Sequence, residues 1–474
     1  MKRKGTILFG ATNNFFKEIL SSIANELVKR GYKVIMMSTS KLIYEYFQEH
    51  SPKADNVYVN EEAVKLGKAY SRDELEELYE KYDFDEKTYF FREIEIVKRR
   101  KEKLRKYTYG LLIYIDSFFK DNKIDHMINC GEGLFNICLW LASKKKDIEY
   151  YHTNWLGYIS GQHYWDSDIN RFTWIKKGYI KENLTKKDME ETEAYLNRSK
   201  KTKKVQGFRP QRVFTFYFFK KFIMYFYNYY KTGPGRIENY SPPTIWKRWV
   251  FRFFKSRYYK WFYEEEFNPD MKYFYFPLHL YYDASIALSN QKFYRQDHVA
   301  KMIADCLPKD YILVTKEHPI QRGITPRYMM KNIKKIKNVK IVSAKTNSHD
   351  IIKNSVGIIT ICSSVGWEAL QYGKPVITLA ETFYDHPQLV HMAKSQNELR
   401  QDIKKVIRSK LKPNKKALQH MVHAFIKSHH DCNYFKDGST TFDRGLSNIK
   451  KLVDVVEWEI DYRKKHRKQT KINQ

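Results

Sequence analysis

The chain has 474 residues, 42% of them hydrophobic, which is enough material for two folded domains. Lys and Arg number 86 against 54 Asp and Glu, and the formal net charge of +32 predicts an anionic partner: a phosphorylated substrate, an acidic polymer, nucleic acid or anionic lipid. The five cysteines are scattered without a CxxC pair, which argues against a disulfide framework and a metal site and fits a reducing cytoplasm, and no apolar run reaches the roughly 18 residues of a membrane span.

The N-terminal part, residues 1–205, has the pattern of a Rossmann-like domain. A strand (Thr6 to Phe9), a helix (Phe15 to Arg30) and a second strand (Lys33 to Ser38) predict a parallel sheet. The first loop offers Asn13 and Asn14 as contacts for an acceptor or for groups lining a cleft. A further strand then leads to Glu132, and glycines on both sides of it would let a ligand approach closely, so Glu132 is a candidate general base.

Residues 206–265 interleave aromatic and basic side chains. Two such runs, VFTFYFFKKFIMYFYNYY and WKRWVFRFFKSRYYKWFY, are separated by a segment rich in Gly and Pro, which predicts two helices. One interpretation is a pair of interfacial helices on an anionic membrane surface. Another is a hairpin that packs its rings on the domain core with its basic groups in water. Stacking on single-stranded nucleic acid is less favoured, because no nucleic-acid-binding module accompanies the segment.

A second α/β domain is predicted at residues 266–412, followed by helices and a disordered basic tail at 413–474. Its first strand leads to His279, a candidate acceptor or cleft residue, and to Asp283, a candidate base. The next strand ends in Lys316, Glu317, His318 and a proline, which would place an imidazole and neighbouring charged groups near a donor phosphate. His318 is therefore a candidate for both phosphate binding and catalysis.

The stretch Gly357 to Asp385 reads as a strand, a tight turn, a helix and another strand. Ser363 and Ser364 lie at the start of the helix, where unpaired N–H groups and the helix dipole favour an anion. Glu368 follows Ser364 by four residues and shares its face of the helix. These groups suit the phosphates and ribose of a nucleotide, although a plain capped helix would also explain the serines.

Two Rossmann-type domains facing a cleft, with a helical insertion and a helical C-terminus, describe the GT-B architecture of nucleotide-sugar transferases. Several segments resemble the bacterial capsule polysaccharide biosynthesis family, which includes transferases that build a Kdo linker on a lipid anchor: KYFYFPLHLYYDAS, LVTKEHP, INCGEGLFN and the region from Lys337 to Asp385. The chain departs from that family in carrying Tyr282-Asp283 where a Pro-Glu is frequent, and Ser363-Ser364 where Gly-Thr is frequent.

The resemblance implies a metal-independent glycosyltransferase at the cytoplasmic face of the membrane. It would need no cofactor, and would use a nucleotide-sugar donor, plausibly CMP-linked, and a glycan or glycolipid acceptor. His318, Ser363, Ser364 and Glu368 would hold the nucleotide. Three alternatives remain open: a CDP-polyol phosphotransferase of teichoic-acid type, a sugar-nucleotide epimerase, and a non-catalytic protein that binds polyanions.

Overall fold

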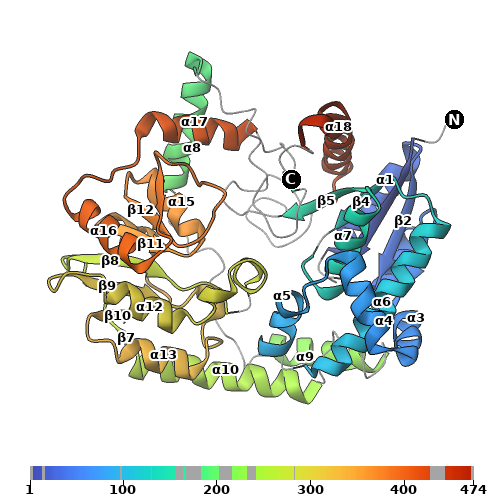
Figure 1. Cartoon of the computed structure of the whole chain (residues 1–474), viewed down its shortest axis with the longest axis horizontal. Helices are drawn as coiled ribbons and strands as arrows, with labels where there is room; N and C mark the ends of the chain where they lie inside the picture. Colours follow the sequence, from blue (N-terminus) through green and yellow to red (C-terminus); the bar gives the residue numbers. More distant parts are fainter. Residues whose placement is uncertain are drawn as a thin grey trace. The chain divides into compact units, whose positions relative to one another are not determined.

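A computed structural model describes residues 4–12, 16–96, 99–129, 131–154, 164–166, 183–201, 216–231, 242–281, 283–427 and 443–470. The chain forms two compact units (Figure 1). The N-terminal unit contains residues 1–176 and 427–474, and the second unit contains residues 177–426. These boundaries differ from the predicted ones at 205 and 412, because helix 186–201 belongs to the second unit and the last helix returns to the first. Asn13 and Asn14 lie outside the described residues.

The N-terminal unit has a sheet of six strands in the order β3-β2-β1-β4-β5-β6. The first five are parallel and β6 is antiparallel to β5. All residues of β1 are buried, as expected for a strand covered on both faces. The strands are β1 (Thr6–Ala11), β2 (Lys33–Ser38), β3 (Asp55–Tyr58), β4 (His126–Asn129), β5 (Glu149–Asn154) and β6 (Tyr164–Asp166).

Helices connect these strands, as the βαβ pattern predicts. Gly31 ends the first helix with φ +94°, a backbone conformation that glycine adopts without strain. The helices are α1 (Lys17–Lys29), α2 (Lys41–His50), α3 (Asn60–Leu66), α4 (Arg72–Tyr82), α5 (Glu86–Phe91), α6 (Lys101–Asp121), α7 (Leu134–Lys145) and the C-terminal α18 (Leu446–Thr470).

Helix α18 packs beside α1 and completes the core of the N-terminal unit (Figure 1). Leu452 and Val456 share a buried cluster with Ile23 of α1. Arg30, at the end of α1, pairs with both Asp454 and Glu457 at 2.6 Å. The prediction of a disordered tail is wrong as far as residue 470, because the chain from Arg463 to Thr470 continues α18. Arg463 also donates to the backbone oxygen of Tyr150 at 2.6 Å.

The second unit has a parallel sheet of seven strands in the order β13-β12-β11-β8-β9-β10-β7. The chain runs outward from β8 through β9 to β10, then crosses to β11 on the other side of β8. The strands are β7 (Glu264–Glu265), β8 (Tyr273–Pro277), β9 (Ile312–Lys316), β10 (Val339–Val342), β11 (Gly357–Thr360), β12 (Val376–Thr378) and β13 (Val390–Met392).

This topology creates a switch point between β8 and β11, where the direction of winding reverses. Open α/β sheets bind ligands at the carboxyl ends of the strands that flank such a point. The same reversal occurs between β1 and β4 in the N-terminal unit. Both sheets thus provide a natural ligand position, and the predicted fold class of two Rossmann-type α/β domains is confirmed. That the two domains face a common cleft stays a prediction.

The helices of the second unit include the aromatic and basic pair predicted from the sequence. Among the described residues, none of the helices has the length and hydropathy that crossing a bilayer requires. The helices are α8 (Lys186–Lys201), α9 (Phe216–Lys231), α10 (Pro242–Phe262), α11 (Ala284–Ala287), α12 (Gln296–Ala304), α13 (Arg327–Lys334), α14 (Ser348–Asn354), α15 (Ser364–Gln371), α16 (Gln396–Ile407) and α17 (Lys415–Lys427).

Candidate functional site

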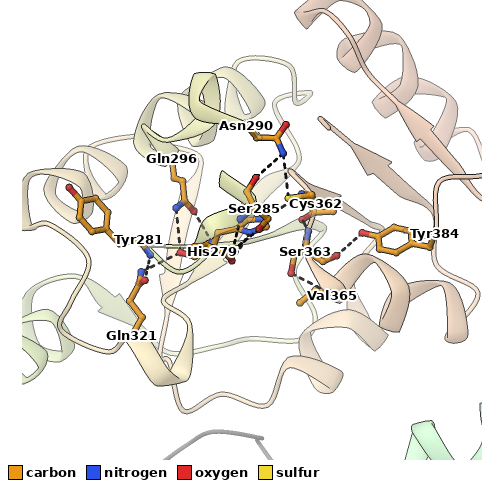
Figure 2. Close-up of polar contacts among 12 residues, drawn as sticks. His279, Tyr281, Ser285, Asn290, Gln296, Gln321, Cys362, Ser363, Val365 and Tyr384 are labelled. Carbon is orange, nitrogen blue, oxygen red and sulfur yellow. Dashed lines mark hydrogen bonds and ion pairs between the residues drawn. The ribbon is translucent and has the colours of Figure 1, made fainter. Parts of the chain in front are cut away.

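The switch point of the second sheet gathers most of the side chains predicted to have a function. The loop after β8 carries His279 and Asp283, the loop after β9 carries His318, and the turn after β11 leads to Ser363 and Ser364. Figure 2 shows His279 at the centre of the polar contacts that join two of these loops. The structure therefore brings together residues that are up to 85 positions apart, Ser364 being the most distant from His279.

His279 links the loop after β8 to the turn after β11. Its ring is 4% exposed, and its Nε2 accepts from the backbone N–H of Cys362 at 3.4 Å. Because Nε2 is an acceptor, Nδ1 carries a proton, and it lies 3.6 Å from Oδ2 of Asp283. Both ring nitrogens have protein partners, so His279 positions the two loops, which differs from its predicted contact with an acceptor.

Asp283 is held from two sides. Its Oδ1 accepts from the backbone N–H of Ser285 at 3.0 Å and from the hydroxyl at 2.6 Å, and its Oδ2 faces His279. Burial would raise the pKa of Asp283, but His279 and the donors of Ser285 outweigh it and hold the pKa below the usual value. The carboxylate is therefore ionised at neutral pH, as a general base must be, although its hydrogen bonds make it a weak one.

Two glutamines that the sequence analysis missed hold the backbone of the loop after β8 (Figure 2). Gln296 accepts from the N–H of His279 at 2.8 Å and donates to its carbonyl oxygen at 3.3 Å. Gln321 donates to the same oxygen at 3.3 Å and accepts from the N–H of Tyr281. Their sequence separations from His279 are 17 and 42 residues, so no local pattern could have identified them.

The start of α15 has the geometry predicted for an anion site. Ser363 is the N-cap, and its hydroxyl accepts from the N–H of Val365 at 3.2 Å. Its carbonyl oxygen accepts from the hydroxyl of Tyr384 at 2.6 Å (Figure 2). Ser364, the first helical residue, is partly exposed. The helix terminus thus presents a hydroxyl and the positive end of its dipole beside the switch point.

The side chain of Trp367 anchors α15 to helices α8 and α17. This side chain is fully buried, donates from Nε1 to the hydroxyl of Tyr195 in α8 at 3.1 Å, and stacks on Phe425 in α17 with centroids 5.3 Å apart. A helix fixed in this way can present its N-terminus without reorganising when an anion binds.

His318 lies among charged groups at the end of β9. Burial, assisted by the charges of Lys316 and His279, lowers its pKa to about 4, against the opposing effect of Asp283. The ring is therefore neutral at pH 7. It can donate a hydrogen bond to a phosphate oxygen, whereas the protonation of a leaving oxygen that the sequence suggested would require a bound anion to raise this pKa.

Lys316, at the end of β9, and Glu368, one turn into α15, interact electrostatically. Burial lowers the pKa of Lys316 to about 8 and raises that of Glu368 to about 7, and each charge opposes the shift of the other. Lys316 is only 2% exposed and donates to the backbone oxygen of Thr346 at 2.6 Å. Its charge therefore acts from inside the domain, while Glu368 keeps partial exposure.

Glu317 has a different environment from the one predicted. Its Oε2 accepts from the N–H of Gly323 at 2.9 Å and its Oε1 from the N–H of Thr325 at 3.0 Å. Burial raises its pKa to about 7. Since both oxygens hold the loop after β9, the structure gives Glu317 a structural role, and not the predicted contact with a nucleotide.

The switch point of the N-terminal unit has neutral polar groups. Thr12 donates to Asn136 at 2.9 Å, Asn136 donates to Asn129, and Asn129 donates to the hydroxyl of Tyr150 at 2.7 Å. Glu132 follows in the same loop, and its backbone oxygen accepts from Arg92 at 3.1 Å. Glu132 thus lies at the carboxyl end of β4, as predicted, beside a network that the sequence did not reveal.

Within the described residues, no cluster of three or more His, Cys, Asp or Glu side chains is arranged to hold a metal ion. At the second switch point, the N-terminus of α15, the hydroxyl of Ser364 and the imidazole of His318 lie near the pair of Lys316 and Glu368. This donor set suits a phosphate ester.

Comparisons with known proteins agree with the family resemblance. Residues 201–433, just under half of the chain, match the family described as "Capsule polysaccharide biosynthesis protein". No functionally curated protein shows significant sequence similarity to the chain.

Several solved structures show distant similarity. One is the KpsC beta Kdo 2,7 transferase of Thermosulfurimonas dismutans, with 14% identity, 72% of this chain and 88% of that chain covered, and a TM-score of 0.38. A glycosyltransferase from Rickettsia africae has 10% identity, coverage of 98% and 99%, and a TM-score of 0.33. The MnaA–UDP co-structure from S. aureus has 11% identity, coverage of 96% and 97%, and a TM-score of 0.32. In sequence, residues 201–433 are thus similar to the capsule polysaccharide biosynthesis proteins.

Proposed function

We propose that the chain is a glycosyltransferase of capsule-type polysaccharide biosynthesis, acting without a metal ion. It transfers a sugar from a nucleotide donor, with a CMP-linked sugar as the first candidate, to a glycan or glycolipid acceptor. The match of residues 201–433 to the capsule family supports a role in polysaccharide assembly, and assembly requires the repeated formation of glycosidic bonds.

One observation supports a donor site in the second unit. The switch point between β8 and β11 places the N-terminus of α15 beside His318 and the buried charge of Lys316. A nucleotide-sugar presents phosphate oxygens that the helix terminus, the hydroxyl of Ser364 and a neutral imidazole can bind. Glu368, one turn into the helix, is suited to accept from a ribose hydroxyl.

The chemistry follows from this placement. A carboxylate removes the proton from an acceptor hydroxyl, and the hydroxyl oxygen attacks the anomeric carbon of the donor. The bond between the anomeric carbon and the phosphate oxygen breaks, and the electron pair leaves with the phosphate. The helix terminus and the N–H of His318 stabilise that negative charge. Asp283 and Glu132 are the two candidates for the base.

The test is a thermal-shift panel of CMP, CDP, UDP and GDP on the wild-type chain and on Ser364→Ala and His318→Ala. We expect one nucleotide class to raise the melting temperature and both substitutions to reduce that shift. His298→Ala is the matched control, since His298 is an exposed histidine on α12 of the same unit. The absence of a shift with any of the four nucleotides would contradict the donor site.

Turnover distinguishes the transferase from its alternatives. With a donor and an acceptor glycan, His318→Ala is expected to lower the rate of transfer by about 100-fold or more, because it removes a group that stabilises the leaving phosphate. Product formed from the donor alone would indicate an epimerase. Incorporation of label from CDP-glycerol would indicate a polyol-phosphate transferase.

A further inference from the structure

The two helices α9 and α10 have an unusual charge composition. There are three Lys or Arg residues in the 16 residues of α9 and six in the 21 residues of α10, and neither helix contains an Asp or Glu. Most of the remaining positions are aromatic. A pair of helices with only positive charges selects an anionic partner and repels a cationic one.

One face of α10 is fixed to the second unit. Arg252 donates to the backbone oxygen of Arg322 at 2.9 Å, and Tyr259 donates to that of Thr325 at 2.7 Å. Gly323 lies so close to this face that a Cβ at that position would come within 2.6 Å of the backbone oxygen of Arg252. These contacts hold α10 on the loop after β9, whose backbone Glu317 binds through Gly323 and Thr325. Figure 1 shows α10 running beside α13.

The opposite face of α10 is a stripe of exposed rings. Lys247, Phe251, Phe254 and Trp261 are three, four and seven positions apart and so share one side of the helix. Phe251 is 61% exposed, Phe254 58% and Trp261 81%. A helix that is anchored on one face and exposes large rings on the other leaves apolar surface in contact with water, which is unfavourable unless a partner covers it.

Helix α9 adds a second exposed set. Its exposed apolar side chains are Phe219, Ile223, Met224, Phe226, Tyr227 and Tyr230. Lys220 is exposed beside them. The two helices contact each other through Phe222 and Trp246, whose ring centroids are 4.9 Å apart. Much of the aromatic surface described for α9 and α10 therefore stays exposed.

We propose that the hairpin of α9 and α10 docks on an anionic phospholipid surface, with its exposed rings and aliphatic side chains inserted among the acyl chains and its basic groups at the phosphates. Aromatic side chains favour the membrane interface, and lysine and arginine beside them add electrostatic attraction. This inference does not depend on the proposed sugar transfer.

Two other occupants fit the surface less well. Nucleic acid bases would stack on the rings, but Ile223 and Met224, which are 52% and 55% exposed, provide no stacking surface and suit acyl chains. A second copy of the same face would bring exposed lysines such as Lys247 and Lys260 against their counterparts, with no carboxylate in either helix to pair with them.

The first test measures binding to phosphatidylcholine vesicles made with and without phosphatidylglycerol, using the whole chain and co-sedimentation. We expect binding to the vesicles that contain phosphatidylglycerol and weakening by salt. The variant Phe251→Ser, Phe254→Ser, Trp261→Ser should bind these vesicles at least about 100-fold more weakly than wild type, because it removes the exposed rings of α10. The control is Val64→Ser, Leu446→Ser, at positions 46% and 60% exposed in the N-terminal unit, which should bind as wild type.

A second test keeps the proposal falsifiable if the triple variant folds poorly. Brominated phosphatidylglycerol quenches tryptophan only where the ring enters the acyl region, so Trp261→Phe should remove a large part of the quenching seen with wild type. Charge reversal at the exposed Lys220, Lys247 and Lys260 should abolish the preference for anionic vesicles.

Three results would overturn the proposal. One is equal binding of the triple variant and the control. Another is tight binding to single-stranded RNA without binding to vesicles. The third is a dimer in solution that the triple variant disrupts, with no vesicle binding by the monomer.

Discussion

Replacing Gln321 with Leu would test how the candidate site is held in place. Gln321 is 1% exposed. Its amide oxygen accepts from the N–H of Tyr281, and its nitrogen donates to the carbonyl oxygen of His279 at 3.3 Å and to the hydroxyl of Thr325 at 2.6 Å. Leucine has a similar volume but none of these groups, so the substitution removes three hydrogen bonds with little change in packing.

The magnitude can be worked out from the partners left behind. The carbonyl oxygen of His279 loses one of its two hydrogen-bond donors and keeps the bond from Gln296 at 3.3 Å. The N–H of Tyr281 and the hydroxyl of Thr325 lose a partner, and a buried polar group left unpaired costs about 1–3 kcal/mol. We expect the free energy of unfolding of the second unit to fall by about 2–4 kcal/mol. For a unit of this size the melting temperature should fall by roughly 4–16 °C.

The assay is urea unfolding followed by circular dichroism, with Gln388→Leu as the matched control. Gln388 is exposed, so its substitution should change the free energy of unfolding by less than about 0.5 kcal/mol. Gln321→Leu should also weaken stabilisation by nucleotide, since it loosens the loop that carries His279 and Asp283. If Gln321→Leu changes stability no more than the control, the glutamine does not hold this loop and the reasoning is wrong.

Two further predictions concern α15 and His318. A Cβ on Gly366 would overlap the hydroxyl of Tyr384, so Gly366→Ala should destabilise the second unit by about 1–3 kcal/mol in the same urea assay, and an unchanged midpoint would contradict this packing. The pKa of His318 is about 4 in the folded chain and about 6.5 when unfolded, so the unfolded chain binds more protons between these values and stability is lost as the pH falls through them. Relative to His318→Asn, the free energy of unfolding of wild type should fall by up to about 3 kcal/mol from pH 6.5 to pH 4, and parallel curves would exclude the lowered pKa.

Much of the fold could be predicted because its strands are short, buried and flanked by breakers. The segments Thr6–Ala11 and Gly357–Thr360 are buried and mainly apolar, and each leads into a loop and a helix, a pattern typical of parallel α/β sheets. The position of Ser363 as an N-cap was also readable, since the chemistry of capping is local.

The return of α18 to the first sheet could not be read in the same way. Its hydrophobic positions predict a helix but do not say which sheet the helix covers. That choice depends on Arg30, more than 400 residues earlier, whose guanidinium meets Asp454 and Glu457. The charged end that looked like a tail continues α18, and at its start Arg463 reaches the backbone of Tyr150 and lies 4.3 Å from the ring of Tyr151.

The candidate site residues also divide into those that a local pattern predicts and those whose surroundings depend on distant parts of the chain. His318 and Ser364 were predicted from their places shortly after strands, and their binding of an anion stays a prediction. Glu317 was assigned to the nucleotide because it is their neighbour, yet a one-residue step along the chain turns its carboxylate toward the amides of Gly323 and Thr325. Sequence adjacency cannot show which face of a strand end a side chain takes.

The two switch points have equivalent topology but different chemistry, and this difference supports the assignment of the substrates. The point between β1 and β4 has Thr12, a partly exposed neutral group that can pair with a sugar hydroxyl and that the buried Asn136 and Asn129 hold in place. The point between β8 and β11 has a helix terminus and the imidazole of His318, which can pair with phosphate. A transferase needs one position for a charged donor and one for a neutral acceptor. If this assignment is correct, substitution of Asn136, which holds Thr12, should weaken binding of the acceptor. The stabilisation of the protein by nucleotide should stay unchanged.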